Sequence, residues 1–400
     1  MSAITLGLEK LISSSQSQKL QDSLKGNIAY LGHSAAVDSN LNLGLELMIQ
    51  TFGKRLTKAF GPQHGFVTDV QDNMIETDHV IHPHYKIPIY SLYGEHRKPT
   101  AEMLENLNTI VVDLQDVGTR VYTYITTLSL LMEACENRDI EVVVLDRPNP
   151  VGGEIWEGPI LEEEWKSFVG HHPIPQRHAL TIGEVAKLQQ RLHCPNTALR
   201  VIAMDDWKRS FHWNDLGRAW INPSPNLPTY ESSLTFAGTV LYEGTNISEG
   251  RGTTRSLEVL GAPGIDPINF AKTAQAQLEK AQITGLKLRP LQFFPMFQKH
   301  KSLACGGIHL HPTEPKKVRT WRAGALLLRE FYQQNDFAFQ WNDSPYEYQY
   351  ENLAIDYING GTSLRKWVEK NGSLEDLLEL EKKNWPDYLN LREDILIYSH

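Results

Sequence analysis

The segment 241–255 holds the densest group of chemically active side chains in the sequence. Its glycines permit tight turns, and loops of this kind often carry ligand sites. A solvated surface turn is the alternative. We favour a ligand-binding loop because carboxylates and arginines are interleaved with the glycines. The polar members are Glu243, Asn246, Glu249, Arg251 and Arg255.

A second polar group follows the apolar run 109–114. Asp116 and Arg120 come directly after this run, and Tyr122 and Tyr124 follow them. Such a set could hold a sugar by hydrogen bonds and ring stacking. An internal ion pair between the aspartate and the arginine is the alternative. We favour the ligand site, because ligands of open α/β sheets bind beyond the carboxyl ends of the strands.

Two segments fix polar side chains between prolines. They are Asp146-Arg-Pro-Asn-Pro150 and Pro223-Ser-Pro-Asn-Leu-Pro228. Rigid frames of this kind suit a binding site and a plain turn equally well, so both interpretations stay open. If the frames belong to a site, the side chains that they present are Arg147, Asn149 and Asn226.

Metal and nucleotide chemistry find little support in the sequence. Histidines are frequent, with one group at 79–96 and a pair at 309 and 311, but no HExxH or compact ligand set occurs. The sequence also has no GxSxG, Walker or GxGxxG motif. We therefore expect neither a metal nor a cofactor, and a metal hydrolase is the weakest of the functional alternatives.

The first half of the chain alternates short apolar runs with helical patterns, which predicts a mostly parallel sheet buried on both faces. The helical patterns cover 41–50, a start near Pro99 and Thr100, and 123–136. The expected strands cover 27–31, 55–60, 87–92, 109–114 and 141–146. The loops 61–65, 113–120 and 146–150 follow strands and could line one crevice.

The rest of the chain has a different pattern. Residues 151–230 are rich in Pro, Gly and Trp, with one helix that begins after a capping box at Thr181. Beyond Tyr230 the pattern predicts helices at 269–281, 318–333 and 373–383 with a strand near 308–310. We expect an α/β domain over 1–230, a smaller α+β domain over 231–400 and a cleft between them.

Composition restricts the classes of partner. The 400 residues include 48 acidic and 39 basic side chains, for a net charge of -9, which disfavours nucleic acid and membrane surfaces as partners. We expect a cytoplasmic location. The sequence has three scattered cysteines, no signal-peptide core and no apolar run long enough to span a membrane. The oligomeric state is left open.

Taken together, these segments resemble a bacterial family, long classed as a domain family of unknown function, whose characterised members are exo-β-N-acetylmuramidases. The resemblance implies a Rossmann-like first domain, a smaller second domain, and release of N-acetylmuramic acid from non-reducing ends of peptidoglycan fragments. It covers nearly the whole chain, and it rests on 60–65, 90–100, 113–124, 145–150, 223–226, 243–254, 305–307 and 391–398.

The chain departs from the family pattern at one chemically decisive position. The family motif usually reads Phe-Gly-Pro-Glu-His-Gly, and the resemblance implies that its glutamate is the catalytic carboxylate. Here that residue is Gln63. An amide cannot protonate a leaving oxygen. The family's usual Asn near position 33 is also replaced, by His33. A catalytically silent amino-sugar-binding protein is therefore the alternative to a glycosidase.

The resemblance also implies roles for individual side chains. Gln63 occupies a catalytic position and, with His64, is expected to bind substrate, while Arg120 and Arg251 could pair with the lactyl carboxylate of muramic acid. The expected substrate is a small amino-sugar glycan. Carboxylates that could replace the missing acid are Glu243, Glu249, Asp116 and Glu76.

Overall fold

The computed structural model describes residues 4–71, 74–343 and 345–399. Its main sheet has seven strands in the order β3-β4-β2-β1-β5-β6-β7. Neighbouring strands are parallel except β3 and β4. This confirms the mostly parallel α/β sheet. The strands are β1 (Ile28–Gly32), β2 (Leu56–Gly61), β3 (Val80–Ile81), β4 (Pro88–Ser91), β5 (Thr109–Asp113), β6 (Glu141–Leu145) and β7 (Ala198–Ile202).

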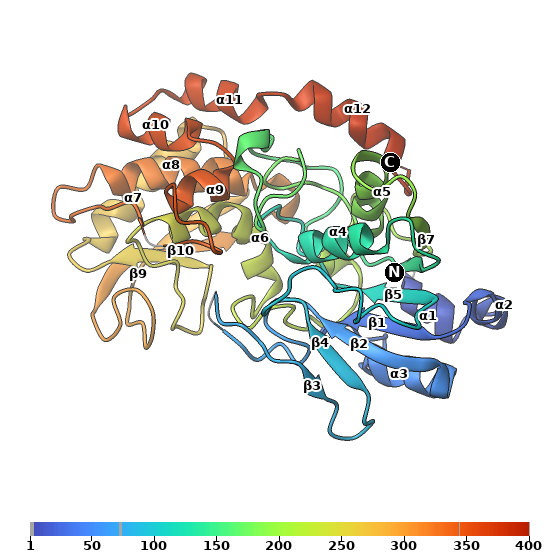
Figure 1. Cartoon of the computed structure of the whole chain (residues 1–400). Coiled ribbons are helices and arrows are strands. Elements are labelled where there is room, and N and C mark those ends of the chain that lie inside the picture. The colour runs from blue at the N-terminus through green and yellow to red at the C-terminus, as the bar shows by residue number, and fades with distance from the viewer. Residues whose placement is uncertain (1–3, 72–73, 344, 400) are drawn as a thin grey trace.

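Helices cover both faces of this sheet (Figure 1). Successive residues of a strand point to opposite faces, so Ala29 and Leu31 of β1 pack in one apolar cluster while Ile28 and Tyr30 pack in the other. This two-sided burial explains the unbroken apolar runs in the sequence. One face is covered by α1 (Gly7–Ile12) and α3 (Gly44–Phe52), with α2 (Ser17–Ser23) beside α1, and the other by α4 (Tyr124–Cys135) and α5 (Ile182–Leu192).

A second, antiparallel sheet follows, with strand order β8-β10-β9. It consists of β8 (Val259–Ala262), β9 (Leu286–Phe293) and β10 (Cys305–Pro312), and it packs with α6 (Tyr230–Thr239), α7 (Pro267–Lys280) and α8 (Thr320–Tyr332). This is the smaller α+β part of the fold.

Two glycines let α6 and α8 cross in direct backbone contact. A Cβ atom on Gly238 would lie 2.0 Å from the carbonyl oxygen of Thr320, and one on Gly324 would lie 2.5 Å from that of Gly238. Only glycine fits at such a crossing. The crossing fixes the end of α6, from which the chain enters a 3-10 helix, η4 (Val240–Gly244). The other 3-10 helices are η1 (Gly53–Arg55), η2 (Glu163–Trp165), η3 (Trp213–Asp215) and η5 (Pro315–Lys317).

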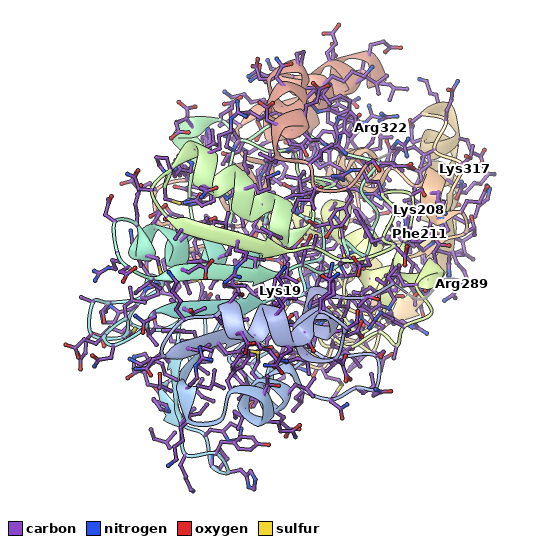
Figure 2. The ribbon with its side chains drawn as sticks, turned by 90° about the vertical axis from the view of Figure 1, so that its right-hand side faces the viewer. Lys19, Lys208, Phe211, Arg289, Lys317 and Arg322 are labelled. Carbon is purple, nitrogen blue, oxygen red and sulfur yellow. The ribbon has the colours of Figure 1, made fainter. Side chains whose placement is uncertain are left out.

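The last helices lead from the second sheet back to the first (Figure 1). α12 packs against α5, and beyond it the hydroxyl of Tyr398 donates to Oδ2 of Asp146 at 2.6 Å. Figure 2 shows the molecule from the side, with Arg322 of α8, which pairs with Glu381 of α11 at 2.8 Å. The four helices are α9 (Ala354–Asn359), α10 (Ser363–Glu369), α11 (Leu374–Lys382) and α12 (Trp385–Ile395).

A buried ion pair joins the 151–180 loops to the start of α8. Arg177 Nη1 donates to Glu157 Oε1 at 2.8 Å, and both side chains are almost completely buried. Glu157 Oε2 accepts from the backbone N–H of Trp321 at 3.1 Å, and Arg177 also donates to the carbonyl of Val318 at 3.3 Å. These contacts hold the two sheets in a fixed relation.

The helix predicted to start at Pro99 and Thr100 is wrong. Residues 101–106 form turns. Thr100 does begin a helix-like turn, because its Oγ1 accepts from Met103 N at 3.3 Å, but Asn106 takes a left-handed φ of 59° and redirects the chain. β5 starts three residues later, which leaves no length for a helix.

Within the described residues, no helix has the length and apolar character to span a membrane.

Candidate active site

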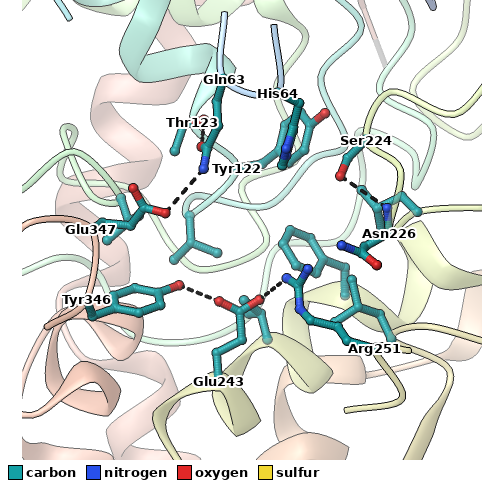
Figure 3. A pocket seen from close by; sticks show the side chains of 16 residues that line it. Gln63, His64, Tyr122, Thr123, Ser224, Asn226, Glu243, Arg251, Tyr346 and Glu347 are labelled. Carbon is teal, nitrogen blue, oxygen red and sulfur yellow. Dashed lines mark hydrogen bonds and ion pairs between the residues drawn. The ribbon is translucent and has the colours of Figure 1, made fainter. Parts of the chain in front are cut away.

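A pocket lies beyond the carboxyl ends of β2 and β5 and is closed from the opposite side by η4 and the segment 345–353 (Figure 3). Polar side chains from distant parts of the chain meet there. The main-sheet part contributes Gln63, His64, Tyr122, Thr123, Ser224 and Asn226, and the second part contributes Glu243, Arg251, Tyr346 and Glu347.

The turn after β2 sets the orientation of Gln63. The N–H of Gly65 donates to the carbonyl of Pro62 at 3.1 Å, which closes the turn. Thr123 Oγ1, at the start of α4, donates to Gln63 Oε1 at 2.5 Å. The side-chain NH₂ of Gln63 therefore faces the opposite wall, where it donates to Glu347 Oε1 at 3.2 Å.

His64 lines the same pocket as a neutral ring. Its Nδ1 donates to the carbonyl of Val70 at 2.8 Å, so Nε2 is the acceptor nitrogen. Burial, together with the charge of Arg251, lowers the pKa of His64 to about 4, although the bond to Val70 opposes the shift. Its backbone φ of 70° lies in the left-handed region, a strained conformation for a non-glycine residue that tends to occur at functional sites.

Glu347 is the pocket carboxylate that the sequence did not reveal. It is 3% exposed, and its Oε2 accepts from the hydroxyl of Tyr93 at 2.6 Å. Burial raises the pKa of the Glu347 carboxyl above its ordinary value, and the nearby charge of Glu243 acts in the same direction. The hydrogen bonds from Tyr93 and Gln63 oppose the shift without cancelling it.

Glu243 lies at the end of η4 in a different electrostatic setting. Its Oε1 accepts from Arg251 Nη2 at 2.5 Å, and its Oε2 accepts from the hydroxyl of Tyr346 at 2.8 Å. Figure 3 shows both carboxylates, Glu243 and Glu347, directed into the pocket. One carboxylate is thus paired with a cation, while the other accepts from an amide and a phenol.

Glu249 supports Arg251 from outside the pocket. Arg251 Nε lies 3.1 Å from Glu249 Oε1, and Lys299 Nζ donates to Glu249 Oε2 at 2.8 Å. Burial opposes ionisation of Glu249, but the charges of Lys299 and Arg251 outweigh it and lower the pKa of the carboxyl. Glu249 therefore holds the guanidinium in place against Glu243.

Several predicted site residues line this pocket and several do not. The side chains brought together are Gln63, His64, Tyr122, Asn226, Glu243 and Arg251. Tyr124 lies next to Tyr122, with ring centroids 4.5 Å apart, and both hydroxyls donate to the carbonyl of Pro223 at 2.8 Å. These two tyrosines therefore hold the 223–226 turn at the pocket wall.

Asp116 and Arg120 lie behind the wall. Asp116 Oδ2 accepts from the N–H of Gly118 at 2.7 Å and lies 3.2 Å from His178 Nε2. The guanidinium of Arg120 is fully buried and donates to the carbonyls of Pro159, Ile174 and Ile358 at 3.0, 2.8 and 3.2 Å. Burial lowers the pKa of Arg120 to about 9.

The remaining predicted residues have contacts of their own outside this pocket. Arg147 pairs with Asp113 at 2.5 Å, and none of the residues 146–150 lines the pocket. Asn149 bridges Val151 N and Leu180 O, and Asn246 bridges Ala338 O and Gln340 N. Glu76 is half exposed and accepts from the hydroxyl of Tyr348 at 3.2 Å, near the pocket rim.

The described part of the chain holds no group of three or more His, Cys, Asp or Glu side chains that could bind a metal ion. His309 and His311 are adjacent, with ring centroids 3.9 Å apart, but Arg289 donates to His309, and His309 Nε2 lies 3.4 Å from Glu258. These side chains form a polar cluster on the second sheet.

Comparison with known proteins places the whole chain in one group. Residues 28–231 match the family model "Exo-beta-N-acetylmuramidase NamZ, N-terminal", and residues 234–398 match "Exo-beta-N-acetylmuramidase NamZ, C-terminal". The chain is 37% identical over 378 residues to the peptidoglycan beta-N-acetylmuramidase NamZ of Bacillus subtilis strain 168, covering 94% of this chain and 88% of that protein.

Two solved structures from Bacteroides fragilis NCTC 9343, both of the DUF1343 family, share the fold. The first is 26% identical, with a TM-score of 0.84 over the full length of both chains. The second is 24% identical, with a TM-score of 0.75 over all of this chain and 99% of the other, and it supports the fold alone.

Proposed function

This chain belongs to the exo-β-N-acetylmuramidase NamZ family, and from that premise we propose that it is a glycosidase that releases N-acetylmuramic acid from the non-reducing ends of peptidoglycan fragments. The family models match both parts of the fold, and the pocket lies where those parts meet. The proposal therefore concerns the pocket described above.

The observation that carries the proposal is a pair of buried carboxylates, Glu243 and Glu347, that face one pocket. Glycosidases of the common type need two carboxyl groups, one as acid and one as base or nucleophile. Gln63 removes the carboxyl group that the family motif supplies. The pocket nevertheless keeps two carboxyl groups, those of Glu243 and Glu347. It therefore still has the groups that this chemistry requires.

The free space of the pocket has a volume of about 40 Å³. Sites that enclose small molecules typically measure about 300–1,000 Å³. Entry of an amino sugar therefore requires the walls to separate.

Arg251 is the pocket cation that we propose for recognition of the lactyl carboxylate of muramic acid. Arg251→Ala should weaken binding of N-acetylmuramic acid more than that of N-acetylglucosamine, by about 1.5–3 kcal/mol, because only the former carries the anion. Calorimetry measures the Kd of each sugar on the same preparation of the variant. The ratio of the two Kd values does not depend on how much of the variant is folded. Equal losses for the two sugars would remove this role from Arg251.

The function itself is tested with a panel of chromogenic β-glycosides of amino sugars. The wild-type protein should cleave the 4-nitrophenyl glycoside of N-acetylmuramic acid and leave that of N-acetylglucosamine largely intact. A protein that binds both sugars and cleaves neither glycoside would instead be the silent amino-sugar-binding protein that Gln63 suggests.

Two further points are proposed with this function. We place the division between the α/β and α+β domains at residues 230 and 231. This is supported by the sheets, because each of them lies wholly on one side of that point in the sequence.

We also propose a cytoplasmic location. It is supported by three buried cysteines without disulfide bonds, Cys135, Cys194 and Cys305, a state that reducing compartments maintain.

A further inference from the structure

We propose that Glu347 is the catalytic acid of this pocket and that Gln63, which replaces the family's usual glutamate, acts as its hydrogen-bond donor. The proposal rests on the proposed function, because it names the group that protonates the leaving oxygen of the glycoside. It transfers the acid role from the turn after β2 to a loop 284 residues further along the chain.

The first support is the fixed orientation of Gln63. Its Oε1 accepts from Thr123, and this leaves the NH₂ group directed at Glu347. A glutamate at position 63 would place a second carboxyl group at 3.2 Å from Glu347, and two carboxyl groups so close cannot both ionise. With Gln63, Glu347 is the single titrating member of this contact.

The second support is the contrast with Glu243. Carboxyl groups whose surroundings differ in this way divide into an acid and a base, because burial favours the protonated form and an adjacent cation favours the ionised form. Glu347 is buried and bonded to Tyr93 and Gln63, whereas Glu243 is bonded to Arg251. The charged groups that act on Glu347 are Glu243 and Arg97.

The third support is the backbone that carries Glu347. Tyr346 and Gln349 exchange N–H to C=O hydrogen bonds at 3.1 and 2.9 Å, which closes a two-residue turn over Glu347 and Tyr348. Both turn residues have positive φ, 46° and 66°, where glycine and asparagine are usual. Strain of this kind costs about 1–3 kcal/mol per residue and persists only where the surroundings hold it.

Contacts at the tip of this turn supply that hold. The guanidinium of Arg97 lies 3.8 Å from the ring centroid of Tyr348, and the hydroxyl of Tyr346 is bonded to Glu243. These two contacts, together with the hydrogen bonds of the Glu347 carboxylate itself, hold the turn so that Glu347 faces the pocket.

The proposed step balances as hydrolysis. The proton of the Glu347 carboxyl passes to the glycosidic oxygen as the bond from that oxygen to C1 of the muramic acid breaks, and the leaving sugar departs as an alcohol. Glu347 becomes a carboxylate that accepts from Gln63 and Tyr93. Water supplies the new hydroxyl at C1 with Glu243 as base or, after covalent attack by Glu243, with Glu347 as base.

The test uses Glu347→Gln on two substrates with different leaving groups. On a disaccharide of N-acetylmuramic acid and N-acetylglucosamine, kcat should fall by about 100- to 10,000-fold, the usual contribution of a general acid. On the 4-nitrophenyl glycoside the loss should be at least about tenfold smaller, since nitrophenolate leaves without a proton. The alkaline limb of the pH profile of kcat/KM should also disappear.

Glu375→Gln, an exposed carboxylate in the first turn of α11, is the control and should behave as the wild type. The ratio of the two losses does not depend on the folded fraction of Glu347→Gln, so poor folding cannot imitate the result. Equal losses on both substrates, or no loss, would overturn the acid role while leaving the proposed function intact. A wild-type protein that cleaves neither substrate would overturn both.

Discussion

Replacing Glu243 by Gln should lower kcat on amino-sugar glycosides by about 100- to 10,000-fold, whichever leaving group the substrate carries. Glu243 is the carboxylate that we expect to act at C1 as base or nucleophile, and Arg251 holds it in place by a hydrogen bond of 2.5 Å. An amide keeps the shape but can neither take a proton from water nor attack C1 as an anion. Steady-state kinetics on the disaccharide and on the nitrophenyl glycoside measure the effect.

The loss of kcat in Glu243→Gln should be the same on both substrates, whereas the loss in Glu347→Gln should differ between them. Glu279→Gln, on the exposed face of α7, is the control and should retain full activity. A Glu243→Gln protein with kcat within about tenfold of the wild type would show that Glu243 holds Arg251 without taking part in the reaction, because a general base or nucleophile contributes more than that.

The second large effect is on stability. Replacing Glu157 by Gln should lower the free energy of unfolding by about 3–5 kcal/mol, the cost of leaving one member of a buried ion pair without its partner. Arg177 is 1% exposed, and Glu157 also accepts the N–H of Trp321, which an amide cannot satisfy together with the guanidinium. Urea denaturation of the two proteins under identical conditions measures the difference.

Glu314→Gln is the matched control for this measurement. Glu314 pairs with Lys317 at 2.6 Å, but both side chains are at least half exposed, and Figure 2 shows Lys317 at the molecular surface. Exposed pairs contribute about 0–1 kcal/mol. Similar losses for Glu157→Gln and Glu314→Gln would mean that the buried pair does not hold the two sheets together.

The sequence identified the central strands because they are buried on both faces. The central residues of β5 (110–112) and of β6 (142–145) are all apolar, so their pattern can be recognised without knowing which elements cover them. β7 escaped notice because it lies at the sheet edge, with Arg200 in its middle and partly exposed side chains. α6 escaped for the opposite reason: it is buried almost all round, so its sequence has no apolar stripe of helical period.

The site was predictable where it follows local patterns. The turn after β2 and the 241–255 segment are recognisable from their own residues, and Gln63, His64, Glu243 and Arg251 do meet in one pocket. Polar type and spacing could not show that the Nη groups of Arg120 donate to three backbone carbonyls behind the pocket wall.

Glu347 could not be found in this way. Its contacts with Gln63 and Tyr93 span 284 and 254 residues, and no local pattern encodes a pairing at that distance. The available signal is weak: a glutamate between two tyrosines, in a segment with no regular period. Its backbone conformation, which marks it most clearly, appears only in the folded structure.

We expect this protein to hydrolyse the bond between C1 of N-acetylmuramic acid and the glycosidic oxygen. The most direct measurement is mass spectrometry of the products when the wild-type protein acts on a β-linked disaccharide of N-acetylmuramic acid and N-acetylglucosamine in ¹⁸O-labelled water, sampled at early times. We expect the two free sugars in equal amounts, with ¹⁸O at C1 of N-acetylmuramic acid. An intact disaccharide, or released N-acetylmuramic acid without the label, would contradict the account.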